Sequence, residues 1–472
     1  MSEIRFGTGG WRAVIADGFT KKNVQLLSAG ICALMQREGT AARGVTIGYD
    51  RRFLSREAAI WAAEVFAGMG VPAELIDREA PTPLIMFAVR EHEKPYGLAV
   101  TASHNPAIYN GVKVFTAGGR DADETVTRRI EAEIDALAVA APAVLPYETA
   151  KARGLITEIN PLNEYIDSIL ALVDMEAIKR ARLKVALDPM YGVSRTSLST
   201  ILLTARCEVD VIHDRHDTLF GGRLPAPNVD TLRSLSAFVV ENGCDLGLAT
   251  DGDADRLGVI DDAGAFLHPN KLLVLLYYYL LEYRGWRGPC VRNNSTTHLL
   301  DRIAAAYGET CYEVPVGFKH ISAKMRETDA IIGGESSGGL TVRGHIAGKD
   351  GIYAATLLCE MAAKTGKRLS TLYAEVTDRF GEVFSADADC RMTPERKRAL
   401  AGLLDGAQAL PAFPFAVSRV SREDGCKVYF ENGGWIICRF SGTEPLLRFA
   451  AEMPDEPSAR ECVALWRTFL GL

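Results

Sequence analysis

Four short loops concentrate the residue types that could do chemistry. The first, residues 101–106, follows the apolar run 97–100 and contains Ser103 and His104. A serine after a buried strand lies at the edge where α/β sheets bind ligands, and a phosphorylated serine can carry a phosphoryl group. The same residue types also suit a helix N-cap or a turn before Pro106. On residue types alone, both roles stay open.

The second loop, residues 251–256, is acidic. Asp251, Asp253 and Asp255 stand at alternate positions and could surround one hard cation, with Mg²⁺ favoured if a phosphate completes its shell. An EF-hand is excluded because Arg256 occupies the position that requires glycine. An exposed acidic turn is the structural alternative. The spacing therefore predicts a metal site.

The third loop, residues 333–339, follows a short apolar run at 330–332 and matches the G-x-S-x-G pattern of serine hydrolases. That match is weak, because downstream only His345 and Asp350 could complete a triad. Glu335, flanked by serines and glycines, instead suits a ligand with many hydroxyl groups.

The fourth loop, residues 439–448, follows the strand predicted at 435–438. Its backbone amides around Gly442, its hydroxyls and its two arginines could cradle a phosphate dianion. A turn with two solvated arginines is the alternative. Because no Walker A motif or clean G-x-G-x-x-G accompanies the loop, we expect the phosphate to belong to a small metabolite.

Strands that alternate with amphipathic helices position these loops. The pattern of strand, loop, helix and strand occurs three times, from residues 45, 183 and 289, and the last 90 or so residues read as hairpin-like strands. This predicts an α/β fold: three similar α/β domains with mixed sheets sandwiched by helices, plus a smaller C-terminal α+β domain. Turn-rich segments at 138–146 and 261–264 guide the boundaries. The predicted domains are residues 1–150, 151–262, 263–382 and 383–472.

Composition excludes several classes of protein. The 472 residues contain 53 Lys plus Arg and 60 Asp plus Glu, a net charge of −7 that argues against a nucleic-acid or anionic-membrane partner. The longest apolar run, residues 272–281, is too short to span a bilayer, and the first residues lack a signal peptide's apolar core. Ten scattered cysteines without a C-x-x-C pair fit a reducing compartment, so we expect a cytoplasmic protein.

Taken together, the loops resemble motifs of the α-D-phosphohexomutase superfamily, the phosphoglucomutases and phosphomannomutases. Five motifs occur in that family's order along essentially the whole chain. They are Phe-Gly-Thr-Gly-Gly-Trp-Arg at residues 6–12, Thr-Ala-Ser-His-Asn-Pro, Asp-Gly-Asp-Ala-Asp-Arg, Gly-Glu-Ser-Ser-Gly and Ser-Gly-Thr-Glu-Pro. The family has three similar α/β domains and a smaller fourth, which agrees with the repeats.

The resemblance implies a role for each loop. Ser103 would be the phosphoserine, and its phosphate would bind Mg²⁺ together with the three aspartates. The implied catalytic residues are Ser103, His104, Lys113 and Arg12; the implied metal ligands are Ser103, Asp251, Asp253 and Asp255. The implied substrate-binding residues are Arg256, Glu335, Ser337, Lys349, Arg439, Ser441, Gly442, Thr443 and Arg448.

The implied reaction interconverts hexose 1-phosphate and hexose 6-phosphate through a hexose 1,6-bisphosphate, which would also act as activator. Glucose is the expected sugar and mannose the second, with a sugar phosphate as the only partner and a monomer or homodimer as the assembly. Some branches of the family carry histidine where this chain has Gly339 or Phe318, which favours a phosphoglucomutase-like branch over a phosphoglucosamine one.

Those departures leave the proton-transfer group open. The candidates are Lys113, Lys349, His345 and His104, with the lysines ahead because neighbouring cations can depress a lysine pKa. Two other classes remain as alternatives: a metal-dependent phosphatase with Asp251 as nucleophile, and a catalytically silent sugar-phosphate sensor.

Overall fold

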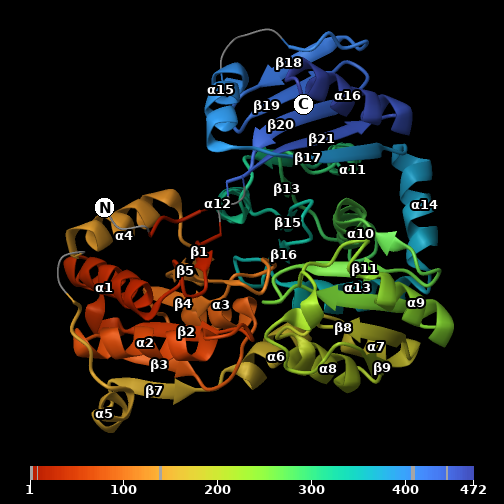
Figure 1. Cartoon of the computed structure of the whole chain (residues 1–472). Helices are drawn as coiled ribbons and strands as arrows, with labels where there is room; N and C mark the ends of the chain where they lie inside the picture. Colours follow the sequence, from red (N-terminus) through yellow and green to blue (C-terminus); the bar gives the residue numbers. More distant parts are fainter. Residues whose placement is uncertain (1–3, 8, 138–140, 406–409, 443–444) are drawn as a thin grey trace.

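Four sheets follow one another along the chain in a computed structural model, which describes residues 4–7, 9–137, 141–405, 410–442 and 445–472 (Figure 1). The predicted fold class is confirmed: three α/β units with mixed sheets precede a smaller C-terminal unit. No helix in these ranges is long and apolar enough to cross a membrane.

The first sheet has the order β1-β5-β4-β2-β3-β7, with β6 on β5. β2, β3, β4 and β7 run parallel, whereas β5 is antiparallel to β4 and β1. The strands are β1 (Trp11–Val14), β2 (Val45–Tyr49), β3 (Ala73–Ile76), β4 (Tyr96–Val100), β5 (Tyr109–Thr116), β6 (Arg120–Asp121) and β7 (Ile156–Ile159). The helices are α1 (Lys21–Arg37), α2 (Ser55–Gly68), α3 (Thr82–Glu91), α4 (Glu124–Leu137) and α5 (Tyr147–Ala152).

Alternation along β4 puts its two faces into different cores. Leu98 and Val100 pack in one cluster with α1, α2 and α4, whereas Ala99 packs in another cluster with α3. Both faces of the sheet are therefore covered by helices, as expected for strands that read as continuous apolar runs.

The second sheet has the order β12-β11-β10-β8-β9, with β8, β9 and β10 parallel. The strands are β8 (Lys184–Asp188), β9 (Glu208–Val211), β10 (Leu246–Thr250), β11 (Leu257–Ile260) and β12 (Phe266–Leu267). The helices are α6 (Leu162–Leu170), α7 (Met175–Ala181), α8 (Arg195–Thr204) and α9 (Arg233–Asn242). The segment 261–264 is the hairpin turn between β11 and β12 inside this sheet.

The third sheet has the order β14-β13-β15-β16, with β16 antiparallel to β15. The strands are β13 (Cys290–Asn293), β14 (Cys311–Val314), β15 (Ile332–Gly334) and β16 (Leu340–Val342). The helices are α10 (Pro269–Glu282), α11 (Leu299–Ala306), α12 (Phe318–Thr328), α13 (Gly351–Thr365) and α14 (Leu369–Phe380). Because α13 packs against α7 and α8, one apolar core runs through the second and third units.

The C-terminal sheet is antiparallel throughout, in the order β17-β21-β20-β19-β18. The strands are β17 (Phe384–Arg391), β18 (Val417–Ser421), β19 (Cys426–Phe430), β20 (Trp435–Phe440) and β21 (Leu446–Met453), and the helices are α15 (Pro394–Asp405) and α16 (Glu456–Phe469). This unit, blue in Figure 1, has a core of its own.

The sheets extend past two of the predicted domain boundaries. β7 pairs with β3 in the first sheet, beyond residue 150, and β12 pairs with β11 in the second sheet, beyond residue 262. Because both are short edge strands, the composition of the chain alone gave no sign of the sheet to which they belong.

Candidate active site

All four units line one cleft of about 390 Å³. It gathers eleven of the predicted site residues: Arg12, His104, Lys113, Arg256, Glu335, Ser337, Lys349, Arg439, Ser441, Gly442 and Arg448. Ser103 and the three aspartates are buried directly beneath, in contact with lining residues. Thr443 lies outside the described residues.

Ser103 follows β4 in a strained backbone conformation. Its φ is +52°, which is uncommon for a residue other than glycine, and its Oγ donates to Asp251 Oδ2 at 2.9 Å. His104 Nδ1 lies 3.4 Å from the same Oγ. The loop thus presents the serine hydroxyl to a carboxylate of the next unit.

A buried arginine that the sequence reasoning missed holds this loop. Arg52 donates to four backbone carbonyls: those of Ser103 (2.6 Å), Asn105 (2.6 Å), Pro106 (2.9 Å) and Tyr109 (3.0 Å). Its position directly after β2, beside the strand that leads to the serine, was the only signal in the sequence.

Asp50 completes that support. Its Oδ1 accepts from Ser55 Oγ at 2.7 Å, and its Oδ2 accepts from Thr101 Oγ1 at 2.6 Å and lies 3.4 Å from Arg52 Nε. The carboxylate therefore ties the end of β2 to the start of the serine loop.

The three aspartates form a compact buried cluster after β10. One carboxylate oxygen from each of Asp251, Asp253 and Asp255 lies within 4.8 Å of the others. Asp253 Oδ1 and Asp255 Oδ1 are buried and accept no hydrogen bond from the described residues. Burial beside two other carboxylates raises the pKa of Asp251 well above its usual value. These all-oxygen donors fit a hard divalent cation.

Two lysines face the cluster. Lys113 Nζ donates to Asp253 Oδ2 at 2.6 Å and to Asp255 Oδ2 at 2.7 Å, and Lys349 Nζ lies 3.1 Å from Asp255 Oδ2. The two carboxylates outweigh the effect of burial and raise the pKa of Lys113. The expectation that neighbouring cations depress the Lys113 pKa is therefore wrong, because its nearest neighbours are anions.

Cations instead surround His104. Arg256, then burial, then Arg12 lower its pKa well below the usual value, so the imidazole is neutral near pH 7. Arg12 NH1 also donates to Asn105 Oδ1 at 2.7 Å, which ties β1 to the serine loop.

Glu335 follows β15 directly. The strand includes Gly333 and Gly334, so it ends two residues later than the run at 330–332 predicted. Glu335 Oε1 accepts from Asn293 Nδ2 at 3.3 Å and from Gly317 N at 3.2 Å, and Ser337 Oγ donates to Oε2 at 3.3 Å. Backbone and side-chain donors thus fix the carboxylate at the cleft wall.

Lys349 and His345, two further candidates from this region, lie in different places. A Cβ on Gly339 would lie 2.2 Å from Lys349 Cδ, so the lysine stem occupies the space that a side chain would need. His345 points away from the cleft: its Nε2 lies 2.6 Å from Asp350 Oδ2, and its ring packs on Tyr353. His345 is a structural residue in this position.

The loop predicted to bind a phosphate, in the C-terminal unit, lines the same cleft. Arg439 of β20 and Arg448 of β21 are cross-strand partners, and Ser441 and Gly442 follow β20. Arg439 Nε donates to Asp424 Oδ1 at 3.3 Å, and Arg448 Nε lies 3.9 Å from Asp389 Oδ1. Sequence reasoning missed Asp389, Asp424 and the cleft-lining Asp121 because isolated acidic residues carry no motif.

Fold and site together define a class of protein: a four-domain α/β protein in which a buried serine and carboxylate triad lie beneath a cleft that an arginine-bearing loop also lines. Its domains match four family descriptions in order: phosphoglucomutase/phosphomannomutase alpha/beta/alpha domain I (residues 3–140), domain II (163–264), domain III (268–380) and the C-terminal domain (389–467). The chain belongs to the phosphoglucomutase/phosphomannomutase family, whose members are isomerases that transfer phosphate.

Relatives with different names match the whole chain. A phosphoglucomutase/phosphomannomutase of Thermococcus kodakarensis is 30% identical over 98% of this chain and 97% of its own. A phosphoglucosamine/phosphogalactosamine mutase of Sulfurisphaera tokodaii is 28% identical over 97% of each. A solved structure from Thermus thermophilus superposes with a TM-score of 0.86 at 30% identity over 100% of both chains. The names of the first two relatives differ in the sugar, while the family is the same.

Proposed function

We propose that this chain is a phosphohexomutase that interconverts hexose 1-phosphate and hexose 6-phosphate, with glucose preferred and mannose second. The observation that carries the proposal is the 2.9 Å contact between Ser103 Oγ and Asp251 Oδ2, beneath a cleft whose far wall bears Arg439 and Arg448. One end of a sugar phosphate can face the serine while the other end is held by the arginines.

Ser103 would carry the phosphoryl group, and the aspartate cluster would bind Mg²⁺. The two buried carboxylate oxygens without hydrogen-bond donors support a bound cation. When bound, Mg²⁺ would neutralise charge on the transferring phosphoryl group. Lys113, held charged between two aspartates, would add a fixed positive charge beside that group.

The chain's own residues would position both ends of the sugar. Glu335 would accept hydrogen bonds from sugar hydroxyls, because donors from Asn293 and Gly317 already fix its orientation. Arg439, Arg448 and the amide of Gly442 would hold the phosphate that does not react. After the first transfer, the bisphosphate would turn and exchange its two phosphates between these positions.

Lys349 is the proton-transfer candidate that we favour. His345 lies away from the cleft, Lys113 is held charged, and cations make His104 a weak base. Lys349 Nζ lies beside the aspartate cluster, and its stem passes over Gly339 of the loop that would bind the sugar. Its ammonium group is therefore close both to the proposed phosphoryl site and to the proposed sugar site.

Two positions of the chain and one relative bear on the sugar preference. Gly339 and Phe318 stand where some family branches have histidine, which favours glucose. The similarity to a mutase named for phosphoglucosamine and phosphogalactosamine adds amino sugars as a third candidate class, after glucose and mannose. For location, we propose the cytoplasm, because all ten cysteines are free thiols; monomer or homodimer stays a prediction.

The test is conversion of glucose 1-phosphate, mannose 1-phosphate and glucosamine 1-phosphate to the 6-phosphates, with Mg²⁺ and trace glucose 1,6-bisphosphate. We expect glucose 1-phosphate to turn over fastest and Ser103→Ala to lose activity by at least about 10³-fold. The matched control is Ser168→Ala, which removes a hydroxyl that donates to Tyr165 O within α6. Release of inorganic phosphate that is retained in Ser103→Ala, without formation of the 6-phosphate, would instead support a phosphatase that uses Asp251.

A further inference from the structure

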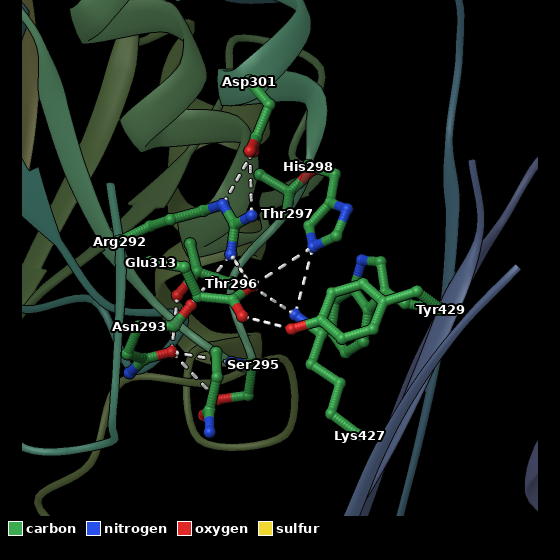
Figure 2. A network of polar contacts seen from close by, with 12 residues as sticks. Arg292, Asn293, Ser295, Thr296, Thr297, His298, Asp301, Glu313, Lys427 and Tyr429 are labelled. Atoms are coloured by element: carbon green, nitrogen blue, oxygen red, sulfur yellow. Dashed lines mark hydrogen bonds and ion pairs between the residues drawn. The ribbon is translucent and has the colours of Figure 1, made fainter. Parts of the chain in front are cut away.

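A buried network of polar contacts holds the C-terminal unit on the third unit (Figure 2). At its centre, Glu313 of β14 accepts from Lys427 Nζ at 2.7 Å, from Arg292 NH1 at 2.5 Å and from the Tyr429 hydroxyl. Arg292 in turn binds Asp301 through two hydrogen bonds of 2.7 and 2.9 Å. Strand β19 is thereby fixed against β13 and β14.

His298 closes the network on its other side. Its ring stacks on both Tyr429 and Trp435, its Nε2 lies 3.0 Å from Lys427 Nζ, and its backbone N donates to Glu452 Oε1 at 2.8 Å. Three strands of the C-terminal sheet, β19, β20 and β21, therefore contact the start of α11. This side of the interface has little freedom to slide.

Asp424 lies three residues before Lys427 and bridges the same two units at the cleft. Its Oδ2 accepts from Val316 N at 2.8 Å and lies 3.4 Å from Asn294 Nδ2, both in the third unit. Its Oδ1 accepts from Arg439 Nε at 3.3 Å, in the C-terminal unit. One carboxylate therefore orients a guanidinium of the cleft against a loop of another unit.

The loop that Asp424 holds is the one that positions Glu335. Val316 is followed by Gly317, whose N–H donates to Glu335 Oε1 at 3.2 Å. Gly317 has a φ of +128°, a conformation that glycine adopts readily, and this turn lets two successive N–H groups serve two different carboxylates. The hydrogen bonds thus run from Arg439 through Asp424 and the 316–317 backbone to Glu335.

We propose that Asp424 is a positioning residue that couples the phosphate contact of Arg439 to the sugar contact of Glu335. The inference rests on the proposed function, since it assigns substrate contacts to both ends. Asp424 uses only the Nε–H of Arg439, so the terminal NH₂ groups stay available to an anion. Docking of the C-terminal unit therefore orders the Arg439 guanidinium and the Glu335 carboxylate together. Because both groups are already ordered, substrate binding does not have to supply the free energy for ordering them.

A neutral amide cannot replace this carboxylate. The side chain in Asp424→Asn keeps one acceptor oxygen, but its NH₂ group would face the N–H of either Val316 or Arg439 Nε. Two hydrogen-bond donors would then point at each other, and one hydrogen bond of the bridge would be lost. The charge also matters, because a guanidinium–carboxylate hydrogen bond is stronger than a neutral one. Asp424→Asn therefore tests the bridge with little change in side-chain volume.

The experiment compares Asp424→Asn and Asp424→Glu with Glu423→Gln, which neutralises the exposed neighbouring carboxylate. We expect both Asp424 variants to lower kcat/KM for glucose 1-phosphate on the order of 10- to 100-fold, mainly through KM. Glu423→Gln stays within about two-fold of wild type. Thermal unfolding of each variant checks that the C-terminal unit is folded. If Asp424→Asn is unstable, Asp424→Glu still tests the bridge, because it keeps the negative charge and changes only the position of the carboxylate.

Coupling is read from a double-mutant cycle of Arg439→Lys and Glu335→Gln. In wild type we expect the two effects on kcat/KM to be non-additive, and in the Asp424→Asn background we expect them to be additive. Additive effects in wild type, or an Asp424→Asn variant with wild-type KM, would overturn the proposal.

A binding experiment separates this inference from the proposed function. Calorimetry with glucose 1,6-bisphosphate is done in a Ser103→Ala background, which cannot accept the phosphoryl group, so that it measures affinity without transfer. We expect Asp424→Asn in that background to bind about 10-fold more weakly than the protein with Asp424. Wild-type protein that binds the bisphosphate but turns over no sugar would contradict the mutase proposal, while weaker binding by the variant would still support the role of Asp424. Equal binding by both proteins would refute that role even in an active mutase.

Discussion

Ser103 shows at the residue scale how a reactive side chain is held. A non-glycine residue at φ +52° costs on the order of 1 kcal/mol or more, which surrounding contacts must offset. Arg52 supplies them by donating to four carbonyls of the loop, an arrangement that uses the planar fork of its guanidinium. The geometry of the serine is therefore set by a residue that does not touch the cleft.

Arg52→Lys should consequently disable the loop without removing the serine. The single ammonium group cannot reach carbonyls on both sides of the loop, so we expect kcat to fall on the order of 10- to 100-fold. Phosphorylation of Ser103, measured by intact-mass spectrometry, should fall in parallel. Arg56→Lys, a change at an exposed position of α2, is the control and should leave both readouts unchanged.

Gly339 gives a second residue-scale prediction. A Cβ there would lie 2.2 Å from Lys349 Cδ, so Gly339→Ala must displace the lysine stem that crosses it. We expect kcat to fall several-fold to about 10²-fold, with little change in unfolding temperature, because the lysine is flexible and partly exposed to the cleft. Gly402→Ala, where nothing lies near the added atom, should be silent. An unchanged kcat in Gly339→Ala would remove Lys349 from proton transfer.

At the scale of elements, Ser103, the aspartate cluster and Glu335 each follow a strand, and neighbouring elements support them. Asp253 follows β10, yet its support comes from the start of α3 in the first unit: Thr82 N donates to Asp253 O at 2.9 Å, and Thr82 Oγ1 donates to Asp253 Oδ2 at 2.7 Å. The first turn of a helix carries unpaired N–H groups and partial positive charge, which favours a carboxylate there. The first unit thus orients Asp253, a proposed metal ligand of the second unit.

Thr82→Val tests that support. Loss of a buried hydrogen bond to a charged group costs about 1.5–3 kcal/mol, and part of this should be seen as weaker metal binding. We expect the Mg²⁺ concentration that gives half-maximal turnover to rise several-fold, with kcat at saturating Mg²⁺ nearly unchanged. Thr40→Val, at a hydroxyl that donates to Met35 O after α1, should leave the Mg²⁺ requirement as in wild type. If Thr82→Val needs no more Mg²⁺ for half-maximal turnover than Thr40→Val does, Thr82 at the start of α3 does not support metal binding by Asp253.

The sequence predicted elements better than it predicted partners. The strands that lead to Ser103, Glu335 and Arg439 were predicted to within about two residues, because short apolar runs and glycine-rich loops mark them. The carbonyls that Arg52 binds and the partners of Lys113 and Asp424 could not be predicted, because each lies more than ten residues away in sequence and is brought close only by the fold. The sign of the Lys113 pKa shift depended on such partners, which is why that expectation was wrong.

At the scale of the whole molecule, the first three units and the fourth differ in how they are joined. One apolar core includes α3 of the first unit and runs through the second and third units, whereas the C-terminal unit has a separate core. Its attachment relies on the polar network around Glu313, Lys427 and His298 and on the bridge of Asp424. A unit attached mainly through polar contacts can change its position with less loss of buried apolar surface than one that shares a core.

That attachment should depend on pH through Lys427. Burial and the neighbouring Arg292 lower its pKa to about 7, although Glu313 accepts from it, while an unfolded lysine has a pKa of about 10.4. Between these values the unfolded chain binds a proton that the folded chain does not, so stability from this group rises with pH across that window. Relative to Lys427→Met, wild type should gain on the order of a few kcal/mol from pH 7 to pH 10.

The other groups of the network do not titrate in that window. The pKa of His298 is lowered to about 3 and that of Glu313 is also lowered, Arg292 and Tyr429 have pKa values raised above their usual ones, and Asp301 is lowered. Burial raises the pKa values of Cys426 and Cys438 in the C-terminal sheet, but these thiols are common to both proteins and their contribution cancels in the difference. The measurement is calorimetric unfolding of both proteins at pH 6.5, 8 and 9.5. The control is Lys324→Met, at a part-exposed lysine paired with Glu327 on α12.

A difference between wild type and Lys427→Met that grows with pH would show that Lys427 is deprotonated on docking, so that the C-terminal unit is held more firmly in alkali than near neutrality. A difference that stays flat would mean that Glu313 keeps the lysine charged throughout, and the network would then act as an ordinary buried ion pair. In that second case removal of the lysine should destabilise the protein at every pH, because Glu313 would lose one of its two cationic partners. The direction of the slope therefore decides which kind of contact holds the fourth unit in place.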